Sequence, residues 1–282
     1  MKVSQRLLIY LFLLIAAGVA MILLQQLSRQ QKEADLTRDY GEIMASGEMN
    51  VVTDYNSIGY FVSGDTALGF QLEMMRALEE EWGVKVNLFL ENSLEDNLRG
   101  LEEQRYDLVA RGIPVNSALR DSFAFTDPIT YNRLVLVQRK APFNEGREPI
   151  RQHLALAGKR IHVAANSPAI LRLNNLSHEI GDTILIQEDP LYGTEQLVMM
   201  VASGDIDFTV CDEKVARLLS ASLPEIDVET DISFTQLESW AVRRDSPVLL
   251  DSLNSWLKRF RETPAFKRIF EKYYESRTGF RP

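Results

Sequence analysis

The chain has 282 residues, of which 45% are apolar and 25% charged, and this ordinary balance excludes collagen-like, low-complexity and disordered classes. Residues 1–32 hold four basic residues and no acid, so the remainder has 27 basic and 40 acidic residues, a net charge of about −13. Such an acidic body argues against nucleic acid as a partner. Cys211 is the only cysteine and the three histidines lack ligand spacing, so no disulfide, metal or cofactor is expected.

The N-terminal segment is a candidate membrane anchor. Leu7–Leu24 contains no charge, and with an extension to Leu27 it reaches about 30 Å as a helix, the thickness of a bilayer core. Lys2 and Arg6 precede it and favour a cytoplasmic start. A cleaved signal peptide is the alternative, but the apolar run exceeds the usual ~7–15 residues and no A-x-A site follows it. The predicted segments are a cytoplasmic start at 1–6, a transmembrane anchor at 7–27 and a stalk at 28–45.

A first α/β unit follows the stalk. Gly69–Trp82 (GFQLEMMRALEEEW) repeats its apolar residues with the period of a helix, and Gly83 ends that helix. The predicted elements are, in chain order, strand Met49–Asp54, helix Gly69–Trp82, strand Val84–Leu90, helix Ser93–Gln104 and strand Tyr106–Ala110. This alternation predicts a parallel sheet with crossover helices.

A second unit begins after the strand Leu134–Gln138. Asn166-Ser167-Pro168 predicts a helix start, with Ser167 as N-cap and Pro168 as the first helical residue. The remaining predicted elements are strands Arg160–Ala164, Thr183–Gln187, Asp207–Cys211 and Ser239–Arg243, and helices Gly193–Ser203, Lys214–Ala221, Pro247–Arg261 and Pro264–Tyr274. The chain is expected to cross between the units near Val137–Lys140 and near Phe234–Glu238. Two crossings predict two lobes with a hinge and a cleft.

Six blocks resemble the family 3 periplasmic solute-binding proteins, in order and at the right spacing. They are GFQLEMMRALEEEWGVKV, LEEQRYDLVARGI, FAFTDPITYNRLVLVQRK, GKRIHVAANSPA, VASGDIDFTVCDEKVARLL and PVLLDSLNSWLKRFRETPAFKRIFEKYY. The resemblance covers about residues 46–275. It implies an α/β, two-lobed, periplasmic-binding-protein-like (type II) fold whose hinge consists of two crossovers. Lobe 1 would hold 46–137 and 238–282, and lobe 2 would hold 138–237.

The block TDYNSIGYFVSGDTALGFQLEMM, together with the predicted anchor, is more closely similar to one branch of these proteins. It resembles the solute-binding-like module of membrane-bound lytic transglycosylase F. That resemblance implies a single-pass protein of the cell inner membrane with its body in the periplasm. In that branch a catalytic domain with an essential glutamate follows the module and cuts peptidoglycan. This sequence stops after the module, so we expect no enzymatic activity.

The resemblance also implies a ligand site. Asp212 matches an aspartate that pairs with a ligand ammonium; its alternative role is to cap the following helix. Ser167 matches a turn that holds a carboxylate at a helix N-terminus, with simple capping as the alternative. Arg120 lies near the family arginine that binds a ligand carboxylate, but one residue too close to Phe125, so that the family position falls on Leu119.

Four more residues are candidates from the ends of the first and third strands. Arg111 stands where the resembled family has a small residue, so it either supplies an anion contact or fills the cleft from within. Asp54, Tyr55 and Tyr60 follow the first strand, where a polar or aromatic side chain contacts a ligand or packs the loop. The sequence contains no G-x-S-x-G, Walker or H-E-x-x-H motif.

The leading hypothesis is a membrane-anchored module that binds a small amino-acid-like or muropeptide-like ligand. Its expected partners are the inner membrane through the N-terminal helix and either an ABC transporter or a cell-wall enzyme, without nucleic acid. Two alternatives stay open: an accessory or scaffold protein of cell-wall turnover with a degenerate cleft, and an enzyme related to the lytic transglycosylases.

Overall fold

The computed structural model describes Met21 and residues 38–275. The predicted anchor at 7–27 falls outside the described residues apart from Met21, as does the stalk up to residue 37. No helix within the described part is long and apolar enough to cross a membrane.

The first lobe is built on a six-stranded sheet of order β4-β1-β5-β13-β6, in which β7 also pairs with β13. The strands β4, β1 and β5 are parallel and β13 runs antiparallel to β5, β6 and β7. The strands are β1 (Glu48–Thr53), β4 (Lys85–Leu90), β5 (Leu108–Pro114), β6 (Phe123–Phe125), β7 (Thr130–Asn132) and β13 (Gln236–Arg243). The helices are α2 (Tyr40–Ser46), α3 (Phe70–Trp82), α4 (Leu94–Glu102), α5 (Ser117–Ser122), α9 (Pro247–Arg261) and α10 (Pro264–Phe270). The predicted βαβαβ unit is present as β1-α3-β4-α4-β5.

The second lobe is built on a five-stranded sheet of order β10-β9-β11-β8-β12. Here β10, β9 and β11 are parallel, and β8 pairs antiparallel with β11 and β12. The elements are β8 (Leu134–Arg139), β9 (Arg160–Ala164), α6 (Ala169–Ile180), β10 (Leu185–Asp189), α7 (Thr194–Ser203), β11 (Thr209–Asp212), α8 (Glu213–Ser220) and β12 (Ile226–Asp231). Pro168, and not Ser167, is the N-cap of α6, so the predicted helix start is wrong by one residue.

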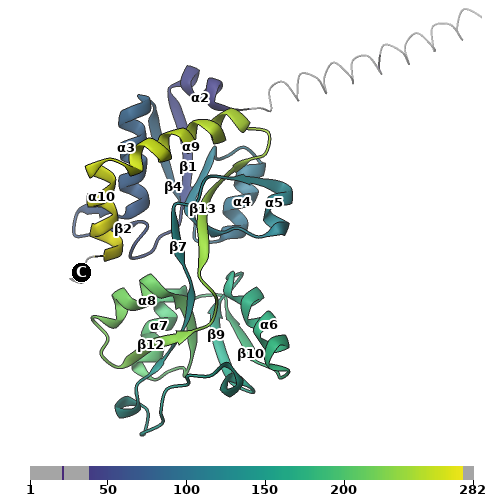
Figure 1. Ribbon diagram of the computed structural model, residues 1–282, viewed down its shortest axis with the longest axis vertical. Helices are drawn as coiled ribbons and strands as arrows, with labels where there is room; N and C mark the ends of the chain where they lie inside the picture. The colour runs from purple at the N-terminus through teal and green to yellow at the C-terminus, as the bar shows by residue number, and fades with distance from the viewer. Residues whose placement is uncertain (1–20, 22–37, 276–282) are drawn as a thin grey trace, which may run out of the picture.

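Two segments join the lobes (Figure 1). The chain leaves the first sheet after β7 and enters the second at β8, and it returns between β12 and β13. The predicted boundary between the lobes lay between residues 137 and 138. In the structure the full length of β8 belongs to the second sheet, because its apolar run pairs there with β11 and β12. We therefore describe 38–132 and 236–275 as the first lobe and 134–233 as the second.

Several short elements were not predicted from the sequence. The hairpin of β2 (Phe61–Ser63) and β3 (Thr66–Leu68) precedes α3, and the expected last helix ends at Phe270 and continues as the π-helix η3 (Glu271–Glu275). The 3₁₀ turns are η1 (Ala141–Phe143) and η2 (His153–Leu156). Gly69 fits between the hairpin and α3 because it has no side chain: a Cβ there would lie 2.2 Å from the carbonyl oxygen of Gly59.

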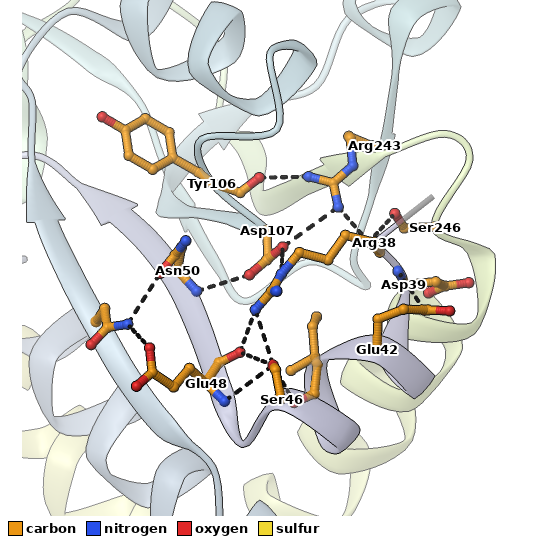
Figure 2. A network of polar contacts seen from close by, with 12 residues as sticks. Arg38, Asp39, Glu42, Ser46, Glu48, Asn50, Tyr106, Asp107, Arg243 and Ser246 are labelled. Carbon is orange, nitrogen blue, oxygen red and sulfur yellow. Dashed lines mark hydrogen bonds and ion pairs between the residues drawn. The ribbon is translucent and has the colours of Figure 1, made fainter. Parts of the chain in front are cut away.

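Residues 38–46 belong to the first lobe and not to the stalk expected at 28–45. Figure 2 shows the network that attaches them. The Nε of Arg38 donates to Asp107 Oδ1 at 2.9 Å, and Arg243 donates to the Arg38 carbonyl oxygen at 2.5 Å. Asp39 caps α2 and also accepts from the backbone N–H of Leu249 at 2.6 Å, at the start of α9. Residues 38–46 are therefore a part of the first lobe.

Candidate functional site

A pocket of about 480 Å³, part of it open to solvent, lies between the lobes. The first lobe supplies Asp54, Asn56, Ile58, Gly59, Gln71, Arg111, Gly112, Asn132, Glu238 and Tyr274, and the second supplies Asp212, Lys214 and Val215. Polar and charged side chains dominate this list, so the pocket suits a charged ligand.

Asp212 faces the pocket from the second lobe. It is the last residue of β11 and the N-cap residue of α8, but its side chain makes no capping hydrogen bond. The carboxylate is therefore not used by the helix that it precedes. Asp212 is an exposed residue by its accessible surface, and it lines the pocket.

Glu238 and Asn132 face the pocket from the two antiparallel strands of the crossing region. Asn132 Nδ2 donates to Glu238 Oε1 at 3.2 Å, so its Oδ1 points away from that carboxylate. Asn132 is 8% exposed, and its Oδ1 is buried without a hydrogen-bond partner. A buried acceptor of this kind is costly unless a ligand or water supplies a donor.

Gly112 makes room for the Glu238 carboxylate. A Cβ at Gly112 would lie 2.6 Å from Glu238 Oε2 and 2.9 Å from Oε1. Since Gly112 is in β5 beside β13, any larger residue there would displace the carboxylate.

Arg111 and Asp54 form an ion pair within the pocket wall. Arg111 Nη2 lies 3.2 Å from Asp54 Oδ2, and Arg111 Nη1 donates to the carbonyl oxygen of Asn92 at 3.0 Å. Asp54 Oδ2 also accepts from Asn56 Nδ2 at 2.8 Å. Both charged groups of the pair are thus occupied by protein partners.

Lys214 extends from α8 in the second lobe to the first lobe. Its Nζ lies 2.5 Å from Thr130 Oγ1, 4.1 Å from the ring centroid of Tyr274 and 4.7 Å from that of Tyr131. Two aromatic faces and a hydroxyl therefore surround this ammonium group. Burial lowers the pKa of Lys214 below its ordinary value, with the charge of Glu238 acting in the opposite direction.

The two carboxylates of Asp212 and Glu238 are held in a setting that disfavours their charge. Burial raises the pKa of Asp212 to about 6, and the negative charge of Asp54 contributes further. Burial raises the pKa of Glu238 to about 7, and the charge of Asp212 contributes. No ion pair within 4.0 Å joins either carboxylate to a described cation. A cation placed between them would lower both pKa values and remove this cost.

A second contact closes the cleft at another point. The backbone N–H and the hydroxyl of Ser57, in the first lobe, donate to Glu195 Oε1 at 2.8 and 2.7 Å. Glu195 is in the first turn of α7 in the second lobe. Together with Lys214, this contact joins the lobes on the two sides of the pocket.

The structure brings three of the predicted site residues into the pocket: Asp212, Arg111 and Asp54. The other four, Ser167, Arg120, Tyr55 and Tyr60, are not among its lining residues. Arg120 is exposed on α5, because Leu119 takes the inward position and packs against a cluster that includes Phe123. Ser167 Oγ accepts from the Ala169 N–H at 3.3 Å, a local contact at the start of α6.

The two tyrosines lie on the loop after β1. Tyr55 is 49% exposed, and its ring centroid lies 6.2 Å from that of Tyr60. They contact one another and do not line the pocket.

Sequence reasoning missed Asn132, Glu238 and Lys214. Lys214 follows Asp212 by two residues at a predicted strand end, so its position was a usable signal. Asn132 and Glu238 are polar residues in the crossing segments, which face a cleft in any two-lobed protein. The position of these two polar residues in the crossing segments could therefore also have predicted them as site residues.

The two α/β lobes, the two crossing strands and the charged pocket between them define a two-lobed binding protein with the type II periplasmic-binding-protein-like fold. Residues 48–276 match the family described as bacterial extracellular solute-binding proteins, family 3. The chain belongs to this family.

Curated relatives include two membrane-bound lytic murein transglycosylases F. The protein of Desulfosudis oleivorans is 27% identical over 237 residues, which are 83% of this chain and 50% of the relative. The protein of Cronobacter sakazakii is 25% identical over 232 residues, 82% of this chain and 44% of the relative. The chain thus spans about half the length of these relatives.

Solved structures share the fold at lower identity. An ancestral arginine-binding protein bound to arginine has a TM-score of 0.70 at 20% identity, covering 81% of this chain and 98% of its own. A binding component of an ABC transporter from Wolinella succinogenes, complexed with lysine, has a TM-score of 0.70 at 16% identity, covering 82% and 97%. Holo ArgBP from T. maritima has a TM-score of 0.68 at 20% identity, covering 83% and 99%.

Proposed function

We propose that this chain is an extracytoplasmic solute-binding module whose interlobe cleft binds a small amino-acid-like or peptide ligand. The ligand's ammonium group is held by Asp212. The observation that carries the proposal is the Asp212 carboxylate, which faces the pocket, makes no capping hydrogen bond and has no cation within ion-pair distance among the described residues. Such a group gains most from a bound ammonium.

The comparisons support this function by analogy. The matched family is named for extracellular solute binding, and structures of the same fold were solved with arginine and with lysine. The transglycosylase relatives are described as membrane-bound, which supports placing the body outside the cytoplasm and a ligand derived from peptidoglycan. We also propose a membrane anchor at 7–27, by analogy with the membrane-bound relatives. By analogy with the same relatives and with the transporter component, the proposed partner is a cell-wall enzyme or an ABC transporter.

Ligand-induced stabilisation tests the proposal. The full chain is screened by thermal unfolding against the amino acids, short peptides and muropeptides, since a ligand at 100 times its Kd stabilises by about 2.7 kcal/mol. We expect at least one ammonium compound to raise the midpoint, and Asp212→Asn to abolish the increase. Asp251→Asn removes the same charge from an exposed position on α9 and should leave the increase intact.

Two outcomes would contradict the proposal. An increase that survives in Asp212→Asn would show that the ligand binds elsewhere. The absence of stabilisation by every compound would favour a scaffold whose cleft is filled by its own Arg111–Asp54 pair. Release of anhydro-muropeptides from peptidoglycan by the purified full chain would instead favour an enzyme.

A further inference from the structure

We infer that the cleft selects a cation and not a zwitterion: its ligand is an amine or a guanidine with no carboxylate beside the bound group, and Glu238 is a specificity-determining residue for it. The inference rests on the proposed function: it keeps ligand binding and the Asp212 contact, and it narrows the ligands to those whose ammonium or guanidinium group has no carboxylate beside it.

The carboxylates that line the pocket outnumber its lining cations. Three carboxylates line it, those of Asp54, Asp212 and Glu238, against the two cations Arg111 and Lys214. Asp54 is already paired with Arg111, so two carboxylates stay without an ion-pair partner. An ammonium or guanidinium group has three to five N–H donors and no acceptor, and it satisfies this arrangement.

Both lining cations already have protein partners. Arg111 is engaged by Asp54 and by the Asn92 carbonyl oxygen. Lys214 is engaged by Thr130 and by two tyrosine rings. Arg120, the arginine nearest to the expected carboxylate position, lies exposed on α5 and outside the pocket lining. A ligand carboxylate would therefore enter beside Asp212 and Glu238, neither of which forms an ion pair with a described cation, and would add another acceptor to them.

The position of Glu238 is built into the fold. Asn132 orients its carboxylate through one hydrogen bond, and Gly112 leaves the space in which that carboxylate lies. Glu238 comes from the first lobe and Asp212 from the second. A cation between them therefore joins the lobes, so binding and closure are coupled.

Matched pairs of ligands test the inference on the unmodified full chain. Agmatine and cadaverine are arginine and lysine without the carboxylate, and their affinities are measured by isothermal titration calorimetry. We expect agmatine to bind at least tenfold more tightly than arginine, and cadaverine at least tenfold more tightly than lysine. Glutamate, which adds a second carboxylate, should not bind.

A variant locates the effect at Glu238. Glu238→Gln should weaken agmatine binding at least tenfold and reduce the preference for agmatine over arginine. Glu80→Gln makes the same change on an exposed position of α3 and should alter neither quantity. The thermal midpoint of each variant, measured without ligand, shows that it is folded.

The outcomes separate this inference from the proposed function. If arginine or lysine binds and its decarboxylated partner does not, the cleft is a zwitterion site: the inference is overturned and the proposed function stands. If agmatine and cadaverine bind but keep their affinity in Glu238→Gln, the role of Glu238 is overturned. If neither these compounds nor any amino acid, peptide or muropeptide binds, both fail.

Discussion

Asp107 is a buried charged residue of the first lobe whose removal should destabilise the protein measurably. It follows the turn after α4, and its side chain is 1% exposed. Its oxygens accept from Arg38 Nε at 2.9 Å and from the Asn50 backbone N–H at 2.8 Å, and Arg243 Nη2 lies 3.6 Å away. Figure 2 shows Asp107 between the two arginines. Asp107→Ala therefore removes the buried one of the two carboxylates beside the Arg243 guanidinium group; the other is the exposed Asp245, 3.7 Å from Arg243 Nε.

The size of the effect follows from the burial of Arg243, whose side chain is 5% exposed. Removing one partner of a buried ion pair costs ~3–5 kcal/mol. Arg243 would keep its hydrogen bonds to the carbonyl oxygens of Tyr106 and Arg38, so we expect the lower end, about 3 kcal/mol. In a protein of this size each 1 kcal/mol shifts the thermal midpoint by ~2–4 °C, which predicts a decrease of about 6–12 °C.

Urea and thermal unfolding of the full chain measure this loss. Arg38→Ala removes a guanidinium that is 29% exposed, and we expect it to cost only about 1 kcal/mol. Asp121→Ala, at an exposed position, should be neutral within ~0.5 kcal/mol. A loss below about 1 kcal/mol for Asp107→Ala would refute the reasoning, because Arg243 would then not depend on its counter-ion.

Three further predictions concern the cleft. Gly112→Ala should displace the flexible Glu238 carboxylate. We expect calorimetry to show a severalfold lower affinity for agmatine, with little change in the thermal midpoint. An unchanged affinity would contradict the role of Gly112 in making room for Glu238. Ser57→Ala removes one interlobe hydrogen bond to Glu195, worth ~1 kcal/mol. Ligand dissociation, measured by stopped flow, should therefore be about fivefold faster. An unchanged rate would exclude a role of this hydrogen bond in closing the cleft. The pKa values of about 6 for Asp212 and about 7 for Glu238 lie above their ordinary 3.8 and 4.5, so the folded state binds more protons than the unfolded state between pH 5 and 8. Their contribution to the stability of the unliganded protein should therefore rise as pH falls, while the cation affinity of the unmodified chain falls. The double variant D212N/E238Q should flatten the pH dependence of stability, and an unflattened dependence would assign the titration to other groups.

Much of the fold was predictable because its signals are local. The helical period of residues 69–82 and the strand runs around 49–54 and 160–164 lie within single elements, and β9 and α9 end at the predicted residues. Short strands such as β6 and β7 were missed because three residues carry no period, and pairing with β13 defines them. Helix α2 was also missed, because its attachment depends on Asp107 and Arg243, which lie far along the chain.

The sequence by itself determined the α/β class, the order of the elements and Asp212 at the end of a strand, since each depends on neighbouring residues. Only the tertiary structure decided which side chains share the cleft. Arg120 was one residue from the expected position, and one residue on a helix turns a side chain by about 100°, enough to take it from the inside to the outside. Asn132 and Glu238 meet because β7 and β13 pair across more than 100 residues of chain, and no local pattern fixes that register.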